Sequence, residues 1–260
     1  LRTLDTRTTG TVSASSLTSL TGASSDLVAV LTSAGIAFTG AQTVTVSDLT
    51  VAASDLNVMD GRTSGNINAT AALVLTGAAT ALATAVASAG ISLTGTEDIT
   101  VTGTAATALT LKAIDVKTSG TVNATAITTL SGLTSDVLYA VTASGITLSG
   151  NETISLSAGT ANAADLNVIH GLTTGPVFAN TITQVSGTAS DVQTALTSGI
   201  TMAANVTATV SDTSLDSSVL YSIDDATTGL INATSVTLLN GTASDVVSVI
   251  TSAGITFNGS

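Results

Sequence analysis

Residues 188–202 read Thr188-Ala-Ser-Asp-Val-Gln-Thr-Ala-Leu-Thr-Ser-Gly-Ile-Thr-Met202, and residues 162–175 read Asn162-Ala-Ala-Asp-Leu-Asn-Val-Ile-His-Gly-Leu-Thr-Thr-Gly175. In each stretch a small polar residue is followed three positions later by an aspartate, and then by apolar residues at helical spacing. This arrangement predicts a helix start, because the free N–H groups of a first helical turn attract both the polar side chain and the carboxylate. Short alternating, β-branched segments come next, so each stretch predicts a helix followed by strands.

The two stretches are halves of a unit that recurs along the whole chain. Turn glycines mark its start at Gly10, Gly65, Gly120, Gly175 and Gly229, so that the first three intervals are equal and the last is one position shorter. Because self-similarity at a fixed period is the signature of repeat architectures, we predict that residues 1–260 form a single solenoid with a repeat of about 55 residues.

A second row of glycines follows the predicted helices. Gly35 and Gly254 belong to this row, and we expect them to end helices in the left-handed conformation. The shortened interval lies at Ser198-Gly199, where other copies read like Leu31-Thr-Ser-Ala-Gly35. The capping arrangement is also expected at Thr213 and Asp216.

Each half-unit, of roughly 27 residues, thus contains a helix and two strands. We expect about nine of them in series, as an α/β repeat solenoid of stacked helix-strand-strand coils with parallel β-sheets, similar to leucine-rich-repeat proteins. A mostly-β solenoid with short helices is the alternative. Because stacked strands advance ~4.8 Å and packed helices need ~8–10 Å, the stack must either curve with its helices outside or offset them alternately.

The strands predict an uncharged outward face. Val44 and Val46 should point inward while their neighbours point out, and the same holds for Ile67 with Ala69, Ile99 with Val101, and Val122 with Ala124. Threonine suits an exposed strand position, and stacked asparagines would form hydrogen-bonded ladders. The other interpretation is a flat face that binds carbohydrate, a mineral, another solenoid or ice. The candidate interaction face comprises Thr43, Thr45, Asn68, Thr70, Thr100, Thr121, Asn123, Thr125, Thr153, Thr207, Thr209, Asn232 and Thr234.

A polar column runs ahead of the turn glycines, always at the same spacing, and comprises Asp5, Asp60, Asp115, His170 and Asp224. We expect these side chains to accept backbone N–H bonds within their own turn. The single histidine replaces aspartate in one copy, and the repeats supply no partners for a catalytic base. We therefore predict no catalytic residues and no enzyme activity.

The composition excludes several classes of function. The chain has a net charge of −12 with five Lys+Arg, which argues against a nucleic-acid partner, and it has no cysteine. Thr or Ser interrupts every apolar run before the ~18 residues that a membrane span needs, so no membrane insertion is expected. No EF-hand loop or calcium-binding nonapeptide is present, and we predict no cofactor; Ca²⁺ at junctions between assembled modules stays open as an alternative.

Four phrases carry a resemblance: Val51-Ala-Ala-Ser-Asp-Leu-Asn-Val58, Gly120-Thr-Val-Asn-Ala-Thr125, Gly187-Thr-Ala-Ser-Asp191 and Thr251-Ser-Ala-Gly-Ile-Thr256. In this phrasing the whole chain resembles the repeat region of very long secreted or cell-surface proteins of marine picocyanobacteria. The resemblance implies an extracellular or cell-surface location and a structural, adhesive or motility-associated role. It carries no site residues over to this chain.

These observations predict a structural repeat module of an extracellular or cell-surface fibre or giant protein. It would act as a spacer or filament by end-to-end stacking, with itself or adjacent repeats as partner. No polar cap is visible at either end, so we expect a segment of a longer chain or a filament subunit. The alternative is an adhesin that binds carbohydrate or a solid surface through the Thr/Asn face.

Overall fold

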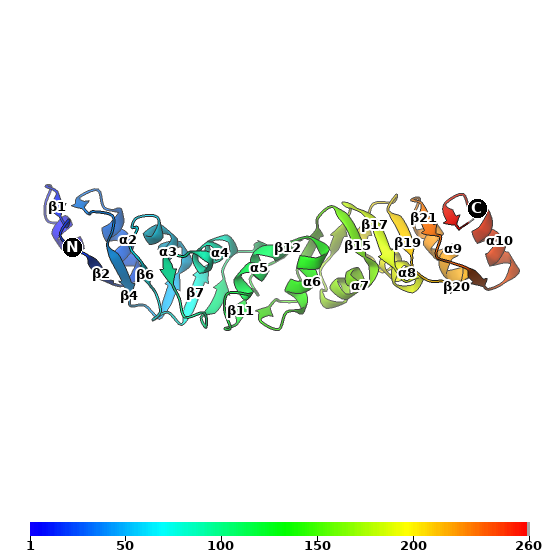
Figure 1. The fold of residues 1–260 in the computed structure, drawn as a ribbon, viewed down its shortest axis with the longest axis horizontal. Coiled ribbons are helices and arrows are strands. Elements are labelled where there is room, and N and C mark those ends of the chain that lie inside the picture. Colours follow the sequence, from blue (N-terminus) through cyan, green and yellow to red (C-terminus); the bar gives the residue numbers. More distant parts are fainter. Residues whose placement is uncertain (259–260) are drawn as a thin grey trace. The chain divides into compact units, whose positions relative to one another are not determined.

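The computed structural model describes residues 1–258, and in that range the chain has an α/β fold with ten helices and parallel sheets. The predicted α/β class is therefore confirmed. The helices are α1 (Arg2–Asp5), α2 (Ser24–Thr32), α3 (Ala53–Asp60), α4 (Ala79–Ala87), α5 (Ala108–Asp115), α6 (Thr134–Thr142), α7 (Ala163–Leu172), α8 (Ala189–Thr197), α9 (Ser217–Ala226) and α10 (Ala243–Thr251) (Figure 1).

Two compact units make up the chain. The first comprises Leu1–Ala106, Thr110–Ile127 and Ala143–Ser149, and the second comprises Thr107–Leu109, Thr128–Thr142 and Gly150–Ser260. Strand β10 (Ala105–Thr107) and helix α5 contribute residues to both.

The first unit contains three parallel sheets. One has the order β2-β4-β6-β8, a second the order β5-β7-β9-β11-β13, and β1 pairs with β3. The strands are β1 (Val12–Ser13), β2 (Ser19–Gly22), β3 (Ile36–Ala37), β4 (Thr43–Val46), β5 (Thr50–Ala52), β6 (Ile67–Asn68), β7 (Val74–Gly77), β8 (Ile91–Ser92), β9 (Asp98–Val101), β11 (Val122–Asn123) and β13 (Ile146–Thr147).

The second unit follows the same plan. Its sheets run β12-β14-β16-β18, β15-β17-β19-β21-β23 and β20-β22, and β15, β17 and β19 are seen side by side in Figure 1. The strands are β12 (Thr129–Gly132), β14 (Thr153–Leu156), β15 (Gly159–Asn162), β16 (Val177–Ala179), β17 (Ile182–Gly187), β18 (Thr201–Met202), β19 (Thr207–Val210), β20 (Ser214–Asp216), β21 (Ile231–Ala233), β22 (Leu238–Asn240) and β23 (Ile255–Phe257).

Neighbouring strands pair at a nearly constant offset along the chain. Val44 lies beside Ile67, and Ile67 lies beside Ile91, so the strand offset is shorter than the predicted half-unit. The two offsets from Val44 to Ile91 therefore add up to fewer residues than one full repeat. Equivalent strands of successive repeats, such as β4 and β9, consequently belong to different sheets. This regular parallel pairing is consistent with a solenoid-like repeat.

The predicted inward and outward alternation of the strands is confirmed. Val44 and Val46 are buried while Thr43 and Thr45 are exposed, and Ile67, Ala69, Ile99, Val101, Val122 and Ala124 are also buried. Helix residues such as Leu56 and Met59 complete this core with fully buried side chains. Each such side chain contributes about 1.5–3 kcal/mol to folding by leaving water, which compensates for the scarcity of aromatic residues.

The helix starts follow the predicted capping in part. The Thr188 Oγ1 accepts a hydrogen bond from the Asp191 N–H and donates one to the Asp191 carboxylate, and Thr242 and Asp245 form the same pair. At Thr213 and Asp216 the prediction is wrong. Strand β20 runs through Asp216, so this residue is itself the N-cap of α9 and accepts from the N–H of Ser218 at 2.9 Å.

The prediction of left-handed helix ends at Gly35 and Gly254 is also wrong. Neither residue has a positive φ, and α2 already ends at Thr32, with Ser33 as its C-cap. Glycine is needed for a different reason, because the Asp5 carboxylate occupies the place where a Cβ of Gly35 would stand.

Candidate interaction surfaces

Outward-facing polar side chains form rows across the sheets of the first unit. In each row the side chains come from adjacent strands in parallel register, where neighbouring residues lie ~4.8 Å apart. One row is Thr21, Thr45, Asn68 and Ser92, and the other is Thr76, Thr100, Asn123 and Thr147.

The second unit has equivalent rows. Across β12-β14-β16-β18 the row is Ser131, Ser155, Phe178 and Thr201. Across β15-β17-β19-β21-β23 it is Asn162, Ser186, Thr209, Asn232 and Thr256. The exposed ring of Phe178 interrupts the first of these rows with an apolar side chain.

The candidate face predicted from the sequence is therefore divided among four sheets rather than gathered on one. The β2-β4-β6-β8 sheet contains Thr43, Thr45 and Asn68, and the β5-to-β13 sheet contains Thr100 and Asn123, with Thr121 just before β11. In the second unit, β14 contains Thr153, and β19 and β21 contain Thr207, Thr209 and Asn232. The remaining three residues lie beyond the ends of β6, β11 and β21: Thr70, Thr125 and Thr234. The division follows from the short strand offset, because equivalent positions of successive repeats fall in different sheets.

One shallow groove does bring several of these side chains together. It has a volume of about 370 Å³ and lies over the outward face of β17, β19, β21 and β23. It is lined by Gln184, Thr207, Ala208, Thr209, Leu230, Ile231, Asn232, Thr234 and Thr256.

The recurring asparagines do not form ladders between strands. The Oδ1 of Asn68 accepts hydrogen bonds from the N–H and the hydroxyl of Thr70, at 3.1 and 2.7 Å. Asn123 with Thr125 and Asn232 with Thr234 repeat these contacts. Asparagine favours such local turns with its own chain, and the Asn-Ala-Thr phrase is therefore a turn that ends each short strand.

A buried polar column was missed by the sequence reasoning. Gln42, Glu97 and Glu152 occupy the same position of three successive repeats and are 1, 2 and 1% exposed, whereas the next repeat has Val206 there. The Glu97 carboxylate accepts hydrogen bonds from the Thr94 N–H at 2.6 Å, the Thr94 hydroxyl at 2.7 Å and the Gly95 N–H at 3.0 Å. The signal that could have found it is a glycine two positions earlier in each of these three copies, Gly40, Gly95 and Gly150, and these glycines all have φ near +77°.

Hydrogen bonds from neighbouring residues favour the charged form of two carboxylates, Glu97 and Asp98. Burial raises the pKa of Glu97, but the hydrogen bonds from Thr94 and Gly95 outweigh it and hold the pKa below its usual value. On the surface, the N–H and hydroxyl of Thr121 donate to Asp98 and lower the pKa of that carboxyl. Both acids serve the loop geometry as hydrogen-bond acceptors.

The aspartate column acts at a longer range than predicted. Asp5, Asp60 and Asp224 accept hydrogen bonds from the hydroxyls of Ser33, Ser88 and Ser252, which lie 28 residues further on, at 2.6, 2.7 and 2.8 Å. The same carboxylates fill the space beside Gly35, Gly90 and Gly254, and Asp115 does so beside Gly145. For Asp5, Asp60 and Asp224 the expectation that the carboxylate braces its own turn is wrong, because each carboxylate points at the loop of the next half-unit.

In the repeat that contains His170, both the residue at the aspartate position and the loop that the aspartate contacts in other copies are different. His170 takes the aspartate position, and the loop equivalent to that of Ser88 is the shortened Ser198-Gly199, in which Gly199 has φ +96° and the place of its Cβ is empty. The buried Nδ1 of His170 has no hydrogen-bond partner. The substitution and the missing residue therefore fall at the two positions that the Asp60–Ser88 contact joins in another copy.

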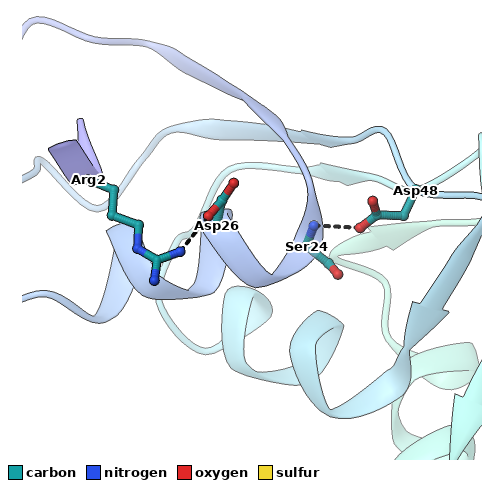
Figure 2. Close-up of polar contacts among 4 residues, drawn as sticks. All are labelled: Arg2, Ser24, Asp26 and Asp48. Carbon is teal, nitrogen blue, oxygen red and sulfur yellow. Dashed lines mark hydrogen bonds and ion pairs between the residues drawn. The ribbon is translucent and has the colours of Figure 1, made fainter.

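Carboxylates also cap helices across neighbouring half-units. Asp48 accepts a 2.6 Å hydrogen bond from the N–H of Ser24 at the start of α2, and Asp212 does the same for Ala189 at the start of α8. Figure 2 shows the first contact together with the ion pair between Arg2 and Asp26, at 2.7 Å. The sequence separation across each capping contact matches the offset between paired strands.

No metal-binding arrangement emerges among the described residues. Within residues 1–258, no three His, Asp or Glu side chains gather into a group that could hold a metal ion. In the same range, none of the helices has the length and apolar character required to cross a membrane.

Comparisons with protein-family models, with curated proteins and with solved structures give no match to this chain.

Proposed function

We propose that this protein is a structural repeat module of an extracellular or cell-surface fibre. It would form one solenoid of about nine stacked helix-strand-strand coils, arranged as in leucine-rich-repeat proteins, and would act as a spacer or filament through end-to-end stacking. The resemblance to giant secreted proteins of marine picocyanobacteria supports the location.

The observation that carries this proposal is the recurring use of polar side chains to hold one half-unit to the next. The Asp60–Ser88 and Asp48–Ser24 contacts join segments separated by one strand offset or slightly more. Repeat proteins built in this way gain stability mainly from contacts between neighbouring repeats. A chain whose polar groups serve those contacts is suited to mechanical extension rather than to chemistry.

The proposal can be tested on the native polypeptide with an antibody against residues 1–260. We expect the antibody to detect either a band far above the 25.2 kDa of this chain, or a band of that mass that sediments as filaments. In both cases, protease treatment of intact source cells should remove the band. A monomer of that mass that is protected inside the cells would overturn the proposal.

An adhesin is the second candidate, and the groove lined by Thr207, Thr209 and Asn232 favours it because it gathers uncharged donors and acceptors on one face. Replacing Thr207 and Thr209 by Lys should abolish binding to polysaccharide or mineral particles. The same replacement at Thr121, Asn123 and Thr125 tests the β5-to-β13 sheet. Circular dichroism checks the fold, and unchanged retention on the particles would exclude the corresponding face.

A further inference from the structure

Helices α2, α4, α6 and α8 occupy the same position of successive repeats, but their first turns are capped differently. Asp48 and Asp212 cap α2 and α8, because each carboxylate accepts the first N–H of its helix at 2.6 Å. At the equivalent positions of the copies that contain α4 and α6, the sequence has Gly103 and Ala158. Neither of these side chains can accept a hydrogen bond, so the chain supplies the capping carboxylate in only two of the four copies.

In the α6 copy, a pocket lies at the position of the capping carboxylate. It has a volume of about 240 Å³ and lies between the first turn of α6 and the segment 157–162, which leads from β14 to α7. Ala158 and Thr134 both line it, and all of its lining residues belong to the second unit. Since a water molecule takes up about 30 Å³ of the liquid, the pocket has room for a small organic molecule.

The hydroxyl of Thr134 is a second, independent sign of a ligand. Thr134 is only 7% exposed, and its Oγ1 is buried without a hydrogen-bond partner. Buried hydroxyl groups are nearly always hydrogen-bonded, so an unpartnered one in the wall of a pocket calls for an explanation. Leu133, which stands where α8 has its capping Thr188, supplies no side-chain acceptor. A polar group from outside the chain would satisfy Thr134.

The chain shows elsewhere which group fits such a pair of donors. Asp98 accepts the N–H and the hydroxyl of Thr121, both at 2.8 Å. Asp216 accepts the N–H and the hydroxyl of Ser218, at 2.9 and 2.6 Å. Thr134 offers the same two groups at the first position of a helix, where the N–H has no partner within the helix and the helix dipole favours a negative charge. A carboxylate is therefore the matching ligand.

The aspartates near this site do not exclude a further negative charge. Asp165 lines the pocket, and Asp136 lies in the first turn of α6. The α2 copy has Asp55 at the position of Asp165 together with its capping aspartate, and the α8 copy has Asp191 at the position of Asp136 together with its own. The fold thus accommodates a capping carboxylate beside an aspartate at either position.

We infer that the pocket at the start of α6 binds the carboxylate of an organic acid or of an acidic sugar, which takes the place of the aspartate that caps α2 and α8. The carboxylate accepts the N–H and the hydroxyl of Thr134. Ser135, Ser157 and Thr160 line the same pocket and offer hydroxyl groups to the rest of the ligand. This binding site goes beyond the proposed fibre role and does not depend on it.

The test titrates the full chain, Leu1–Ser260, with sodium acetate at neutral pH and follows the backbone amides by NMR. We expect a saturable shift of the Thr134 amide signal. Sodium chloride at the same ionic strength and acetamide, which has the same shape without the charge, should not produce it. No saturable shift, or an equal shift with chloride or acetamide, overturns the inference.

Three variants locate the site, with circular dichroism as the check on folding. Ala158→Asp places a carboxylate where Asp212 stands in the α8 copy, so it should abolish acetate binding and raise the urea midpoint. Thr134→Val keeps the side-chain shape without the hydroxyl and should weaken binding by roughly tenfold. Ala164→Asp adds the same charge at an exposed position outside the pocket lining and should retain binding. Acetate binding that persists in Ala158→Asp overturns the inference.

A retention assay distinguishes the two sources of the carboxylate. Immobilised polygalacturonate presents acidic sugars, and galactan presents neutral sugars of the same kind. Retention on polygalacturonate alone, competed by acetate and lost in Ala158→Asp, would assign the site to an acidic polysaccharide. Acetate binding without retention would assign it to a free organic acid. Both outcomes support a carboxylate site, whereas equal retention on galactan that acetate does not compete away would overturn it.

Discussion

The hydroxyl of Ser88 donates a 2.7 Å hydrogen bond to the carboxylate of Asp60, which fills the space beside Gly90 where a Cβ would stand. The serine also accepts the N–H of Gly90 at 3.1 Å. One carboxylate at the end of a helix therefore orders a loop in the next half-unit of the chain. Gly90 is required by this contact and not by its backbone conformation, since its φ is not positive.

Gly90→Ala should destabilise the protein by about 1–3 kcal/mol, because the new methyl group displaces the Asp60 carboxylate and the loop loses its hydrogen bond. Urea unfolding followed by circular dichroism measures the change. In the double variant Gly90→Ala with Asp60→Gly, the cost should be smaller than the sum of the two single costs. Strict additivity would contradict the contact.

Gly65→Ala should cost more, about 2–3 kcal/mol, because its Cβ would meet the backbone carbonyl of Gln42, which cannot rotate away as a side chain does. The same unfolding measurement applies. Gly171→Ala is the matched control: Gly171 lies in α7 with open space at its Cβ. There alanine should stabilise the helix by about 0.5–1 kcal/mol, and equal costs at both sites would show that the close approach at Gly65 is absent.

Acid should weaken the protein partly through Glu97. Its pKa in the folded protein is lower than its usual value, so its contribution to stability is fully present above the unfolded pKa of 4.5 and is lost as the pH falls through the folded pKa. Urea midpoints between pH 7 and pH 3 should fall less steeply in Glu97→Gln than in the parent. Gln42 supports this choice, because glutamine occupies the equivalent site and accepts the Gly40 N–H at 3.1 Å. An identical pH dependence in both proteins would exclude this role of Glu97.

His170 and the short Ser198-Gly199 loop should behave as one coupled pair. His170→Asp alone places a carboxylate against a loop that lacks the matching Ser-Ala-Gly geometry, and inserting Ala after Ser198 alone leaves the histidine without a partner. Both changes together should recover about 1–3 kcal/mol relative to the sum of the single effects. Thermal unfolding of the four proteins measures the coupling, and a coupling near zero would show that the two sites are independent.

Much of the local structure could be predicted from single positions. The alternation at Thr43, Val44, Thr45 and Val46 predicts which side chains are buried, because successive strand residues point to opposite faces. The Thr188–Asp191 pair likewise predicts a helix start. Such predictions succeed because their causes lie within a few residues of the chain.

The candidate face could not be predicted in the same way. The sequence places Thr45 and Thr100 in one column because they occupy equivalent positions of successive repeats, but the structure puts them in different sheets and pairs Thr45 with Asn68 instead. Nothing in the local pattern specifies which strand becomes a neighbour, and the Asn68–Thr70 turn further removes the asparagine from any ladder.

By itself, the sequence determined the repeat, the helix and strand types, and the inward face of each strand, since these depend on spacing, capping and burial within short segments. Only the tertiary structure decided the strand offset that is shorter than a half-unit and the reach of Asp60 to Ser88. The physical reason is that backbone hydrogen bonding fixes the distance between stacked strands, whereas the length of chain between them depends on how every intervening helix and loop packs.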